Sequence, residues 1–335
     1  MTTAAIDIHT HIVPAEFPAY AGKHDAMRWP QMAPIDCGHA NVMIGGKVFR
    51  RVEDYCWDGA RRMAAMARMG ITHQVLSPMP ELLSYWLHPE DTLALGRYIN
   101  DQIAAMVERA PERFFALGTV PLQDPELAAR EVERLMKSGK FRGVEIGTNV
   151  NGTPIGDPRF APFFAAAEEH GAAVFVHALH PAGQERFVGP AQVTNLVGFP
   201  CENAFGIASL LTGGTLERHP GLRLAFSHGG GAFALVLKRL THGWSIYPPV
   251  RERIKEPPAE LARRLYYDTL VYDSATLAFL IASFGIRQLC LGSDFPFDIH
   301  DRKPLERLAP LALAEQDEAL LRGGNALRWL GGGKE

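Results

Sequence analysis

Two histidines stand two positions apart near the start of the chain, in Ile6-Asp7-Ile8-His9-Thr10-His11. The apolar residues around them predict a buried strand, and side chains two positions apart on a strand point to the same face. Both imidazoles would then face one interior, with a spacing that suits metal ligands. The alternative is a pair of structural histidines hydrogen-bonded within a turn, and the motif by itself leaves both interpretations open.

Three more residues able to bind metal or transfer protons follow apolar runs later in the chain. They are His177, His228 and Asp294. One histidine or aspartate at a strand end is more often structural, but several strand ends with the same residue types favour one shared site. Imidazole nitrogens with a carboxylate suit a borderline divalent ion, and an open coordination position would make the site catalytic. We therefore predict a catalytic divalent metal, with zinc as the first choice.

Eight short apolar runs alternate with helical patterns and must position these residues. The runs are Ala5–His9, Thr72–Ser77, Phe115–Val120, Gly143–Gly147, Ala173–His177, Leu222–Ser227, Leu265–Thr269 and Gln288–Gly292. The helical patterns include Asp58–Met69, Asp91–Arg109, Pro125–Ser138, Pro158–His170, Gly206–Arg218, Ala232–Trp244 and Ser274–Phe284. Eight strand-then-helix units predict an α/β fold of the (β/α)8 TIM barrel type. An open doubly wound sheet would also alternate, but no GxGxxG turn follows the first strand.

The length of 335 residues suits a single barrel domain over residues 1–335. Two stretches exceed what a bare barrel needs, residues 14–55 after the first strand and residues 180–203 after the fifth. We expect both insertions to cover the carboxyl-terminal face of the barrel.

The composition excludes several classes of partner. A net charge of −3 and 21% charged residues leave no basic footprint for nucleic acid and no polybasic segment for lipid. No apolar run is long enough to span a membrane, and residues 1–7 lack the pattern of a secretory signal. The four cysteines form no CxxC pair, which favours a reducing, cytoplasmic setting. A small molecule is the expected partner.

Four segments resemble the amidohydrolase superfamily and, within it, the aminocarboxymuconate-semialdehyde decarboxylases and their close relatives. They are Phe49-Arg50, Val120-Pro121-Leu122-Gln123-Asp124, Ser227-His228-Gly229-Gly230-Gly231-Ala232-Phe233 and Leu291-Gly292-Ser293-Asp294-Phe295-Pro296-Phe297. The similarity runs nearly from end to end. It implies that His9, His11, His177 and Asp294 bind one divalent ion. It also implies that His228 is a catalytic histidine that activates the water held by the metal.

The same resemblance assigns two arginines to the substrate. Arg50 matches a residue that binds the substrate carboxylate, with the adjacent Arg51 as the alternative register. Arg239 matches an arginine that relatives pass into the neighbouring subunit's site, which implies a homodimer with shared active sites. Read from the residues alone, both are ordinary surface arginines.

Two departures from the family pattern leave the substrate and one role open. The segment from His177 to Pro181, with His180 beside the expected metal, lacks the Trp-Asp pair of the aminocarboxymuconate enzyme. Glu145 stands where binuclear members carry a modified lysine, so a lysine-bridged pair of ions is not expected. Glu145 remains open as a base, as an extra ligand, or as a buried carboxylate paired with a cation.

We expect a metal-dependent, non-oxidative decarboxylase of a carboxymuconate semialdehyde, such as 2-amino-3-carboxymuconate 6-semialdehyde or a close analogue. A hydratase or hydrolase of a related unsaturated dicarboxylate, lactone or amide would use the same residues, as would a decarboxylase of an ortho-hydroxybenzoate. A silent metal-binding scaffold is the alternative from another class, and His228 beside all four ligands argues against it.

Overall fold

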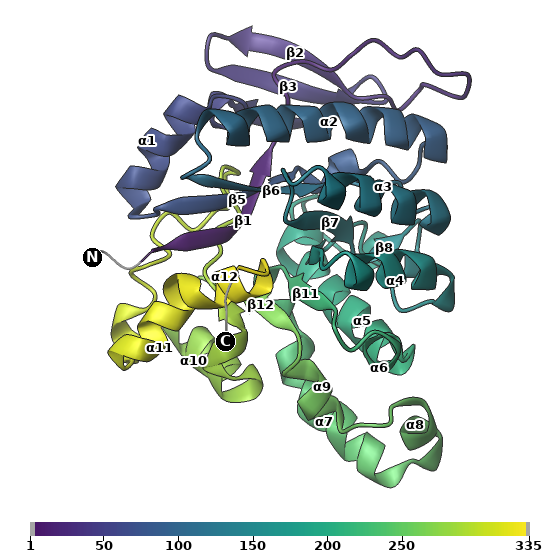
Figure 1. The fold of residues 1–335 in the computed structure, drawn as a ribbon, viewed down its shortest axis with the longest axis vertical. Helices are drawn as coiled ribbons and strands as arrows, with labels where there is room; N and C mark the ends of the chain where they lie inside the picture. Colours follow the sequence, from purple (N-terminus) through teal and green to yellow (C-terminus); the bar gives the residue numbers. More distant parts are fainter. Residues whose placement is uncertain (1–3, 333–335) are drawn as a thin grey trace.

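Eight parallel strands form one sheet in chain order in the computed structural model, which describes residues 4–332 (Figure 1). They are β1 (Ile6–Ile12), β5 (His73–Pro78), β6 (Phe114–Gly118), β7 (Gly143–Gly147), β10 (Ala173–His177), β11 (Arg223–Phe226), β12 (Tyr266–Asp268) and β13 (Leu289–Cys290). Ile8 N donates to Leu291 O at 2.8 Å, and His11 N donates to Phe295 O at 2.7 Å. These bonds join the last strand to the first, so the predicted (β/α)8 TIM barrel is confirmed. Residues 1–3 of the N-terminal stretch considered above lie outside the described range.

The strands are mostly buried because helices cover the outside of the barrel while side chains fill the inside. All five residues of β10 are buried, and alternate ones point inward. Phe175 lies one layer below His177, with its ring 5.1 Å from that of His9. The buried Trp329 packs against Phe175 at 6.2 Å from below. The metal-binding candidates therefore lie next to an apolar layer of the barrel interior.

Helices connect the strands much as the sequence predicts. They are α1 (Gly59–Met69), α2 (Pro89–Arg109), α3 (Pro125–Lys137), α4 (Ala161–Glu169), α5 (Phe199–Thr212), α6 (Thr215–Arg218), α7 (Phe233–Ile246), α8 (Pro248–Arg253), α9 (Pro258–Ala262), α10 (Ser274–Phe284), α11 (Glu315–Ala319) and α12 (Asn325–Trp329). The side chains of Asp58, Asp124 and Asp273 accept backbone N–H bonds at the first turns of α1, α3 and α10. These aspartates are the caps that set the helix starts.

One predicted helix, Gly206–Arg218, is wrong in its bounds. The chain forms α5 from Phe199, and Gly206 lies in the interior of that helix. A Cβ at Gly206 would lie 3.0 Å from the Thr148 side chain, so this glycine serves close helix packing and does not start the helix. The helix stops at Thr212 because Gly213 and Gly214 follow, and Gly214 has φ +69°.

The first insertion contains an antiparallel sheet that the sequence did not predict. Its strands are β2 (Gln31–Asp36), β3 (His39–Ile44) and β4 (Lys47–Glu53), and β4 carries Arg50. β2 and β3 lie at the top of the view in Figure 1. The strands β8 (Asn149–Val150) and β9 (Thr153–Pro154) form a second, two-stranded sheet after β7. The segment after β10 holds a 3-10 turn and a π turn ahead of α5.

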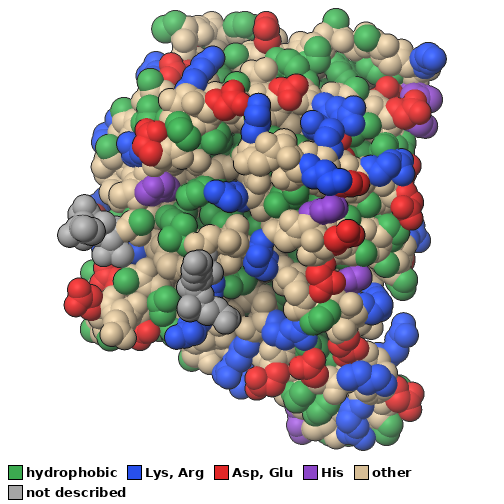
Figure 2. Space-filling view, in the orientation of Figure 1, with side chains coloured by type: hydrophobic (Ala, Val, Ile, Leu, Met, Phe, Trp, Pro, Cys, Tyr) green, Lys and Arg blue, Asp and Glu red, His purple; other side chains and the backbone are tan. Residues whose placement is uncertain are grey.

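Within residues 4–332, no helix combines the length and apolarity that a bilayer crossing needs. Lys, Arg, Asp and Glu side chains are interspersed over the face seen in Figure 2. On this face, charges of both signs are mixed.

Replacement of Gly143 by alanine is expected to destabilise the barrel severely. A Cβ at Gly143 would lie 1.7 Å from Ala173 O of the neighbouring strand β10, so two strands would have to separate. The expected loss is about 3 kcal/mol or more of unfolding free energy, measured by urea denaturation followed by circular dichroism. Gly243→Ala in α7 is the control, because its Cβ has no neighbour closer than 3.6 Å. Equal stability of the two variants would contradict this account.

Candidate metal centre and active site

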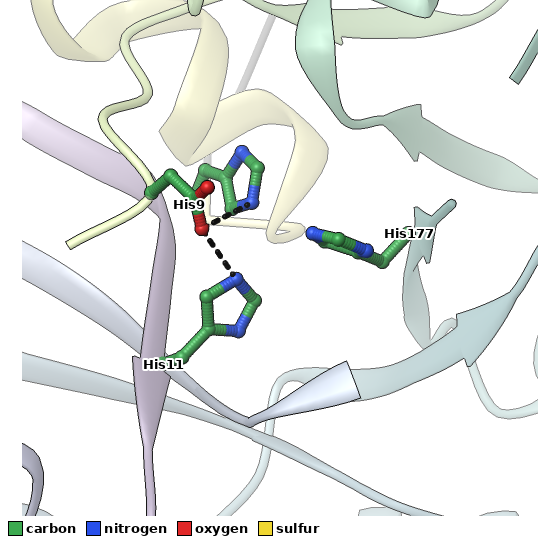
Figure 3. A group of neighbouring side chains, drawn as sticks. His9, His11 and His177 are labelled. Carbon is green, nitrogen blue, oxygen red and sulfur yellow. Dashed lines mark ion pairs between the residues drawn. The ribbon is translucent and has the colours of Figure 1, made fainter. Parts of the chain in front are cut away.

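Three imidazoles and one carboxylate converge at the carboxyl ends of β1, β10 and β13 (Figure 3). One ligand atom from each of His9, His11, His177 and Asp294 lies within 4.8 Å of all the others, and all four residues are buried. Asp294 Oδ1 is 3.2 Å from His11 Nε2 and 3.5 Å from His9 Nε2, the pairs dashed in Figure 3. The structure thus brings together the four residues that the sequence predicts as ligands.

The three histidine rings are each fixed by a hydrogen bond at Nδ1. The acceptors are Asp268 Oδ2 for His9 at 2.6 Å, the Pro78 carbonyl for His11 at 3.0 Å and the Ala178 carbonyl for His177 at 2.7 Å. With the proton on Nδ1, each Nε2 keeps a free lone pair, and none of these Nε2 atoms has a hydrogen-bond partner among residues 4–332. Buried polar atoms are rarely left unpaired, so the group could hold a divalent metal ion.

Electrostatics in this space also favour a cation. Burial opposes charge on Asp294, but the His9 charge and the neighbouring His11 ring outweigh it and hold the pKa of that carboxyl well below its usual range. Burial likewise opposes charge on His9, yet the Asp294 and Asp268 carboxylates raise its pKa to about 9. Two carboxylates therefore stabilise a positive charge among the rings. A divalent ion would take the place of that proton.

Asp268 is a site residue that the sequence analysis missed. Besides His9 Nδ1, its carboxylate accepts the backbone N–H groups of His228 at 2.9 Å, Gly229 at 2.8 Å and Leu270 at 3.0 Å. The bonds from His228 and Gly229 hold His228 at φ 54°, a left-handed conformation that is costly outside glycine. A signal was present, because Asp268 ends the seventh strand as Asp294 follows the eighth.

His228 stands beside the ligand group without being part of it. Its ring centroid is 5.0 Å from that of His177 and 5.3 Å from that of His9. Asn203 Nδ2 donates to the Ser227 carbonyl at 3.0 Å and lies 3.2 Å from His228 Nδ1. Nδ1 must therefore accept, and the ring proton sits on Nε2. Burial and the nearby His9 charge lower the pKa of His228 to about 4, so the ring is neutral at pH 7 and can donate from Nε2.

A small cavity of about 30 Å³ opens on the ligand group and includes Arg50. The Arg50 guanidinium lies 4.1 Å over the Phe297 ring, which stacks on His11 at 5.1 Å. Arg51, the next residue on β4, is exposed. The cavity therefore contains a fixed cation near Asp294 and His177, and of the two registers considered this arrangement supports Arg50.

The other two candidates take different places. Arg239 lies exposed on α7, away from the lining of this cavity within one subunit. Glu145 is fully buried on β7, with Oε2 3.8 Å from His11 Nδ1. Burial raises the pKa of Glu145 to about 8, so the carboxyl is neutral at pH 7. Its oxygens have no hydrogen-bond partner in the described part of the chain, and no Lys or Arg there pairs with it.

Asp268→Asn is expected to weaken metal binding about 10- to 100-fold while the protein stays folded, because the amide no longer orients His9 as a charged acceptor. The measurement is calorimetric titration of the metal-free protein with Zn²⁺ and with Mn²⁺. The exposed Asp298 near Asp294 offers the matched control Asp298→Asn, for which unchanged affinity is expected. Unchanged affinity in both variants would remove Asp268 from the centre.

Comparison with known proteins identifies the family. The amidohydrolase family model matches residues 6–332. The chain is 35% identical over 328 residues to the 2-amino-3-carboxymuconate-6-semialdehyde decarboxylase of Dictyostelium discoideum, covering 97% of this chain and 91% of that protein. The structure resembles the apo form of IDCase from Metarhizium anisopliae, with a TM-score of 0.84, 19% identity and coverage of 98% and 97% of the two chains. It also resembles a dihydroxybenzoic acid decarboxylase from Polaromonas sp. JS666 with bound manganese and 2-nitroresorcinol, with a TM-score of 0.77, 20% identity and coverage of 98% and 97%. This chain therefore belongs to the amidohydrolase family, as an enzyme of its decarboxylase type.

Proposed function

We propose that the enzyme removes carbon dioxide, without oxidation, from a carboxymuconate semialdehyde, either 2-amino-3-carboxymuconate 6-semialdehyde or a close analogue. One observation carries the proposal: three free Nε2 lone pairs and the Asp294 carboxylate converge beside a neutral His228, in a cavity that contains Arg50. The Dictyostelium relative, whose name states this reaction, supports the choice of substrate.

One divalent ion per subunit would be held by His9, His11, His177 and Asp294, and Zn²⁺ suits three imidazoles and a carboxylate. The manganese in the Polaromonas structure makes Mn²⁺ the ion to test beside it. When bound, the ion supplies Lewis-acid polarisation of the substrate and activation of water. Neutral Glu145 adds no further charge to this ligand set.

His228 is the proposed catalytic residue. The negative charge of a bound substrate would raise the pKa of the ring, which would take up a proton from solvent and deliver the Nε2 proton to the substrate carbon that carries the departing carboxylate. The carbon–carbon bond to that carboxylate then breaks, its electron pair returns to the conjugated chain, and carbon dioxide leaves. The ring returns to the neutral imidazole, so the net change is replacement of a carboxylate by hydrogen. In the neutral ring, Asn203 keeps the proton on Nε2 by donating to Nδ1.

Arg50 would hold the other carboxylate of the substrate with two parallel hydrogen bonds and so fix the reacting carbon. Arg239 of a second subunit would bind the same carboxylate, in a homodimer with shared sites. On α7, which projects from the barrel in Figure 1, Arg239 follows the exposed apolar residues Leu235 (73% exposed) and Val236 (44%). An apolar exposed face beside an arginine supports burial against another copy of the chain.

A cytoplasmic enzyme with a small-molecule carboxylate as its partner fits the remaining features. All four cysteines lie in the described part of the chain and are unpaired thiols. Unpaired cysteines, two of them exposed, are typical of a reducing compartment.

An ortho-hydroxybenzoate is the second candidate substrate. The cavity is lined by the aromatic side chains of Phe49, Phe199 and Phe297, which suit a flat ring. The Polaromonas neighbour, a dihydroxybenzoic acid decarboxylase, supports the same idea. A hydratase or hydrolase would use the same ligands but would release no carbon dioxide.

Metal-loaded enzyme is expected to release carbon dioxide from the semialdehyde, and a chelator is expected to abolish the release. The measurement follows carbon dioxide and the ultraviolet spectrum together over a panel that includes ortho-hydroxybenzoates. Readdition of Zn²⁺ or Mn²⁺ is the control for chelator damage. Absence of release across the panel would move the assignment to a hydratase or hydrolase.

His228→Gln is expected to retain its metal and lose about 10²- to 10⁴-fold in kcat, because the proton donor is missing while the ligands remain. Asp294→Ala is expected to lose both metal and activity. The readouts are metal content by atomic emission and single-substrate kinetics. Equal metal loss in the two variants would contradict the division of roles.

Arg50→Ala and Arg239→Ala homodimers are each expected to be nearly inactive if sites are shared. Random mixing of the two chains would then rebuild one intact site per heterodimer, and activity would recover to about a quarter of wild type. The assay is activity after co-refolding, with each variant refolded alone as the control. No recovery, with heterodimers verified by mass, would place both arginines in the same subunit's site.

A further inference from the structure

Glu81 is a carboxylate on the cavity wall for which the proposed mechanism has no use. It belongs to the short 3-10 helix Pro80–Leu83 that follows β5, and it lines the cavity together with Arg50 and Asp294. Its side chain is 13% exposed. A second carboxylate on this wall disfavours binding of an anionic substrate. Its presence is therefore best explained if the ligand carries a group that pairs with it.

Two loops that are distant in sequence hold Glu81 in place. His180 Nε2 lies 3.2 Å from Oε1 and 3.3 Å from Oε2, and Arg28 Nη2 lies 3.9 Å from Oε1. Trp86 supports both partners, because the Arg28 guanidinium lies 4.0 Å over its ring and the His180 ring centroid is 5.8 Å away. The carboxylate is therefore oriented before any ligand arrives.

The loop that carries His180 is itself built to keep its shape. His180 has φ 42°, a left-handed conformation that a side chain adopts at a cost. Asn149 Nδ2 donates to the Leu179 carbonyl at 2.6 Å and to Glu202 Oε1 at 2.9 Å. Glu202 Oε2 accepts the N–H of Ala182 at 2.8 Å. These buried bonds fix the loop, and with it the angle from which His180 contacts Glu81.

Glu81 keeps spare capacity as an acceptor. A carboxylate offers about four lone-pair positions, and within residues 4–332 the Glu81 side chain has only His180 as a hydrogen-bond partner. In the same cavity Arg50 supplies a cation, and the wall between is largely apolar. The cavity therefore offers a cation for a carboxylate and, separately, an acceptor for an N–H or O–H group.

We propose that Glu81, positioned by His180, accepts a hydrogen bond from an amino or hydroxyl group of the ligand. Through it the cavity selects unsaturated carboxylates that carry such a donor away from the carboxylate held by Arg50. The chemical class of the ligand rests on the proposed function, whereas the acceptor role of Glu81 rests on the cavity. The residue that positions Glu81, His180, lies in the loop that departs from the family pattern.

Binding of inert ligands tests the inference without turnover. Metal-loaded protein is titrated by calorimetry with the meta and para isomers of aminobenzoate and hydroxybenzoate, and with the toluates, in which a methyl group of similar size replaces the donor. For at least one isomer, wild type is expected to bind the donor-bearing ligand about 10-fold or more tighter than its toluate. Equal affinity for every matched pair would overturn the proposal.

Two substitutions distinguish a Glu81 that accepts a hydrogen bond from the ligand from a Glu81 that only links two loops. Glu81→Leu is expected to bring the donor-to-methyl affinity ratio to about one, and Glu81→Gln is expected to reduce it by removing the charge. His180→Leu is the matched comparison, because it removes the positioning contact but leaves the carboxylate, so the ratio should fall only in part and stay clearly above one. Equal weakening of both ligand types in Glu81→Leu and His180→Leu would make Glu81 a structural tie only.

Carbon dioxide release measured on the same samples distinguishes the two levels of the proposal. A donor preference that Glu81→Leu removes, in an enzyme that releases no carbon dioxide from the panel, upholds the role of Glu81 and rejects the proposed reaction. Normal release without any donor preference upholds the reaction and rejects the role of Glu81.

Discussion

The Asp268 carboxylate accepts four hydrogen bonds, and the geometry of the whole site depends on them. One bond turns His9 so that its Nε2 faces His11, His177 and Asp294. Two others hold the backbone N–H groups of His228 and Gly229, beside the proposed proton donor, and the fourth, from Leu270, fixes the loop that follows Asp268. Because Asp268 is fully buried, these bonds are not exchanged for bonds to water. A single side chain therefore couples the proposed metal ligands to the proposed catalytic histidine.

Strained backbone surrounds the site, and rigid strands support it. His180, His228 and Asp294 all have positive φ values, of 42°, 54° and 67°. Each follows the carboxyl end of a barrel strand, where the chain must leave the sheet at once. Asp294 N also donates to the His9 carbonyl at 2.8 Å, so one ligand is bound to the strand of another. The barrel supplies the stability that such local strain requires.

Under the proposed function, metal binding and substrate choice reside in different parts of this fold. The ligands lie on β1 and β10 and directly after β13, where variation would disturb the core. Arg50 on the inserted sheet and Glu81 and His180 on loops lie outside that framework, so they can change without loss of the metal centre. This division explains how decarboxylases of different acids share the fold of this chain.

The strand ends and the five reactive residues could be predicted from the sequence because their signals are local. Alternation within a strand directs His9 and His11 to one side, and parallel strands bring His177, His228 and Asp294 to the same face of a barrel. The inserted sheet was not predicted, since two of its three strands, β2 and β4, are largely exposed and lack the apolar run that marks a buried strand. Gly206 was taken for a helix start because its close contact with Thr148 leaves no mark in the neighbouring residues.

By itself the sequence determined the barrel and the residue types of the metal centre, because both depend on patterns only a few residues long. Only the tertiary structure decided which distant residues form hydrogen bonds with the residues of the site. His9 meets Asp268 across 259 residues, and Glu81 meets His180 across 99. It also decided that Arg50 faces the cavity while Arg51 is exposed. Such contacts depend on how distant segments pack and on what burial does to charge, and neither is encoded in local spacing.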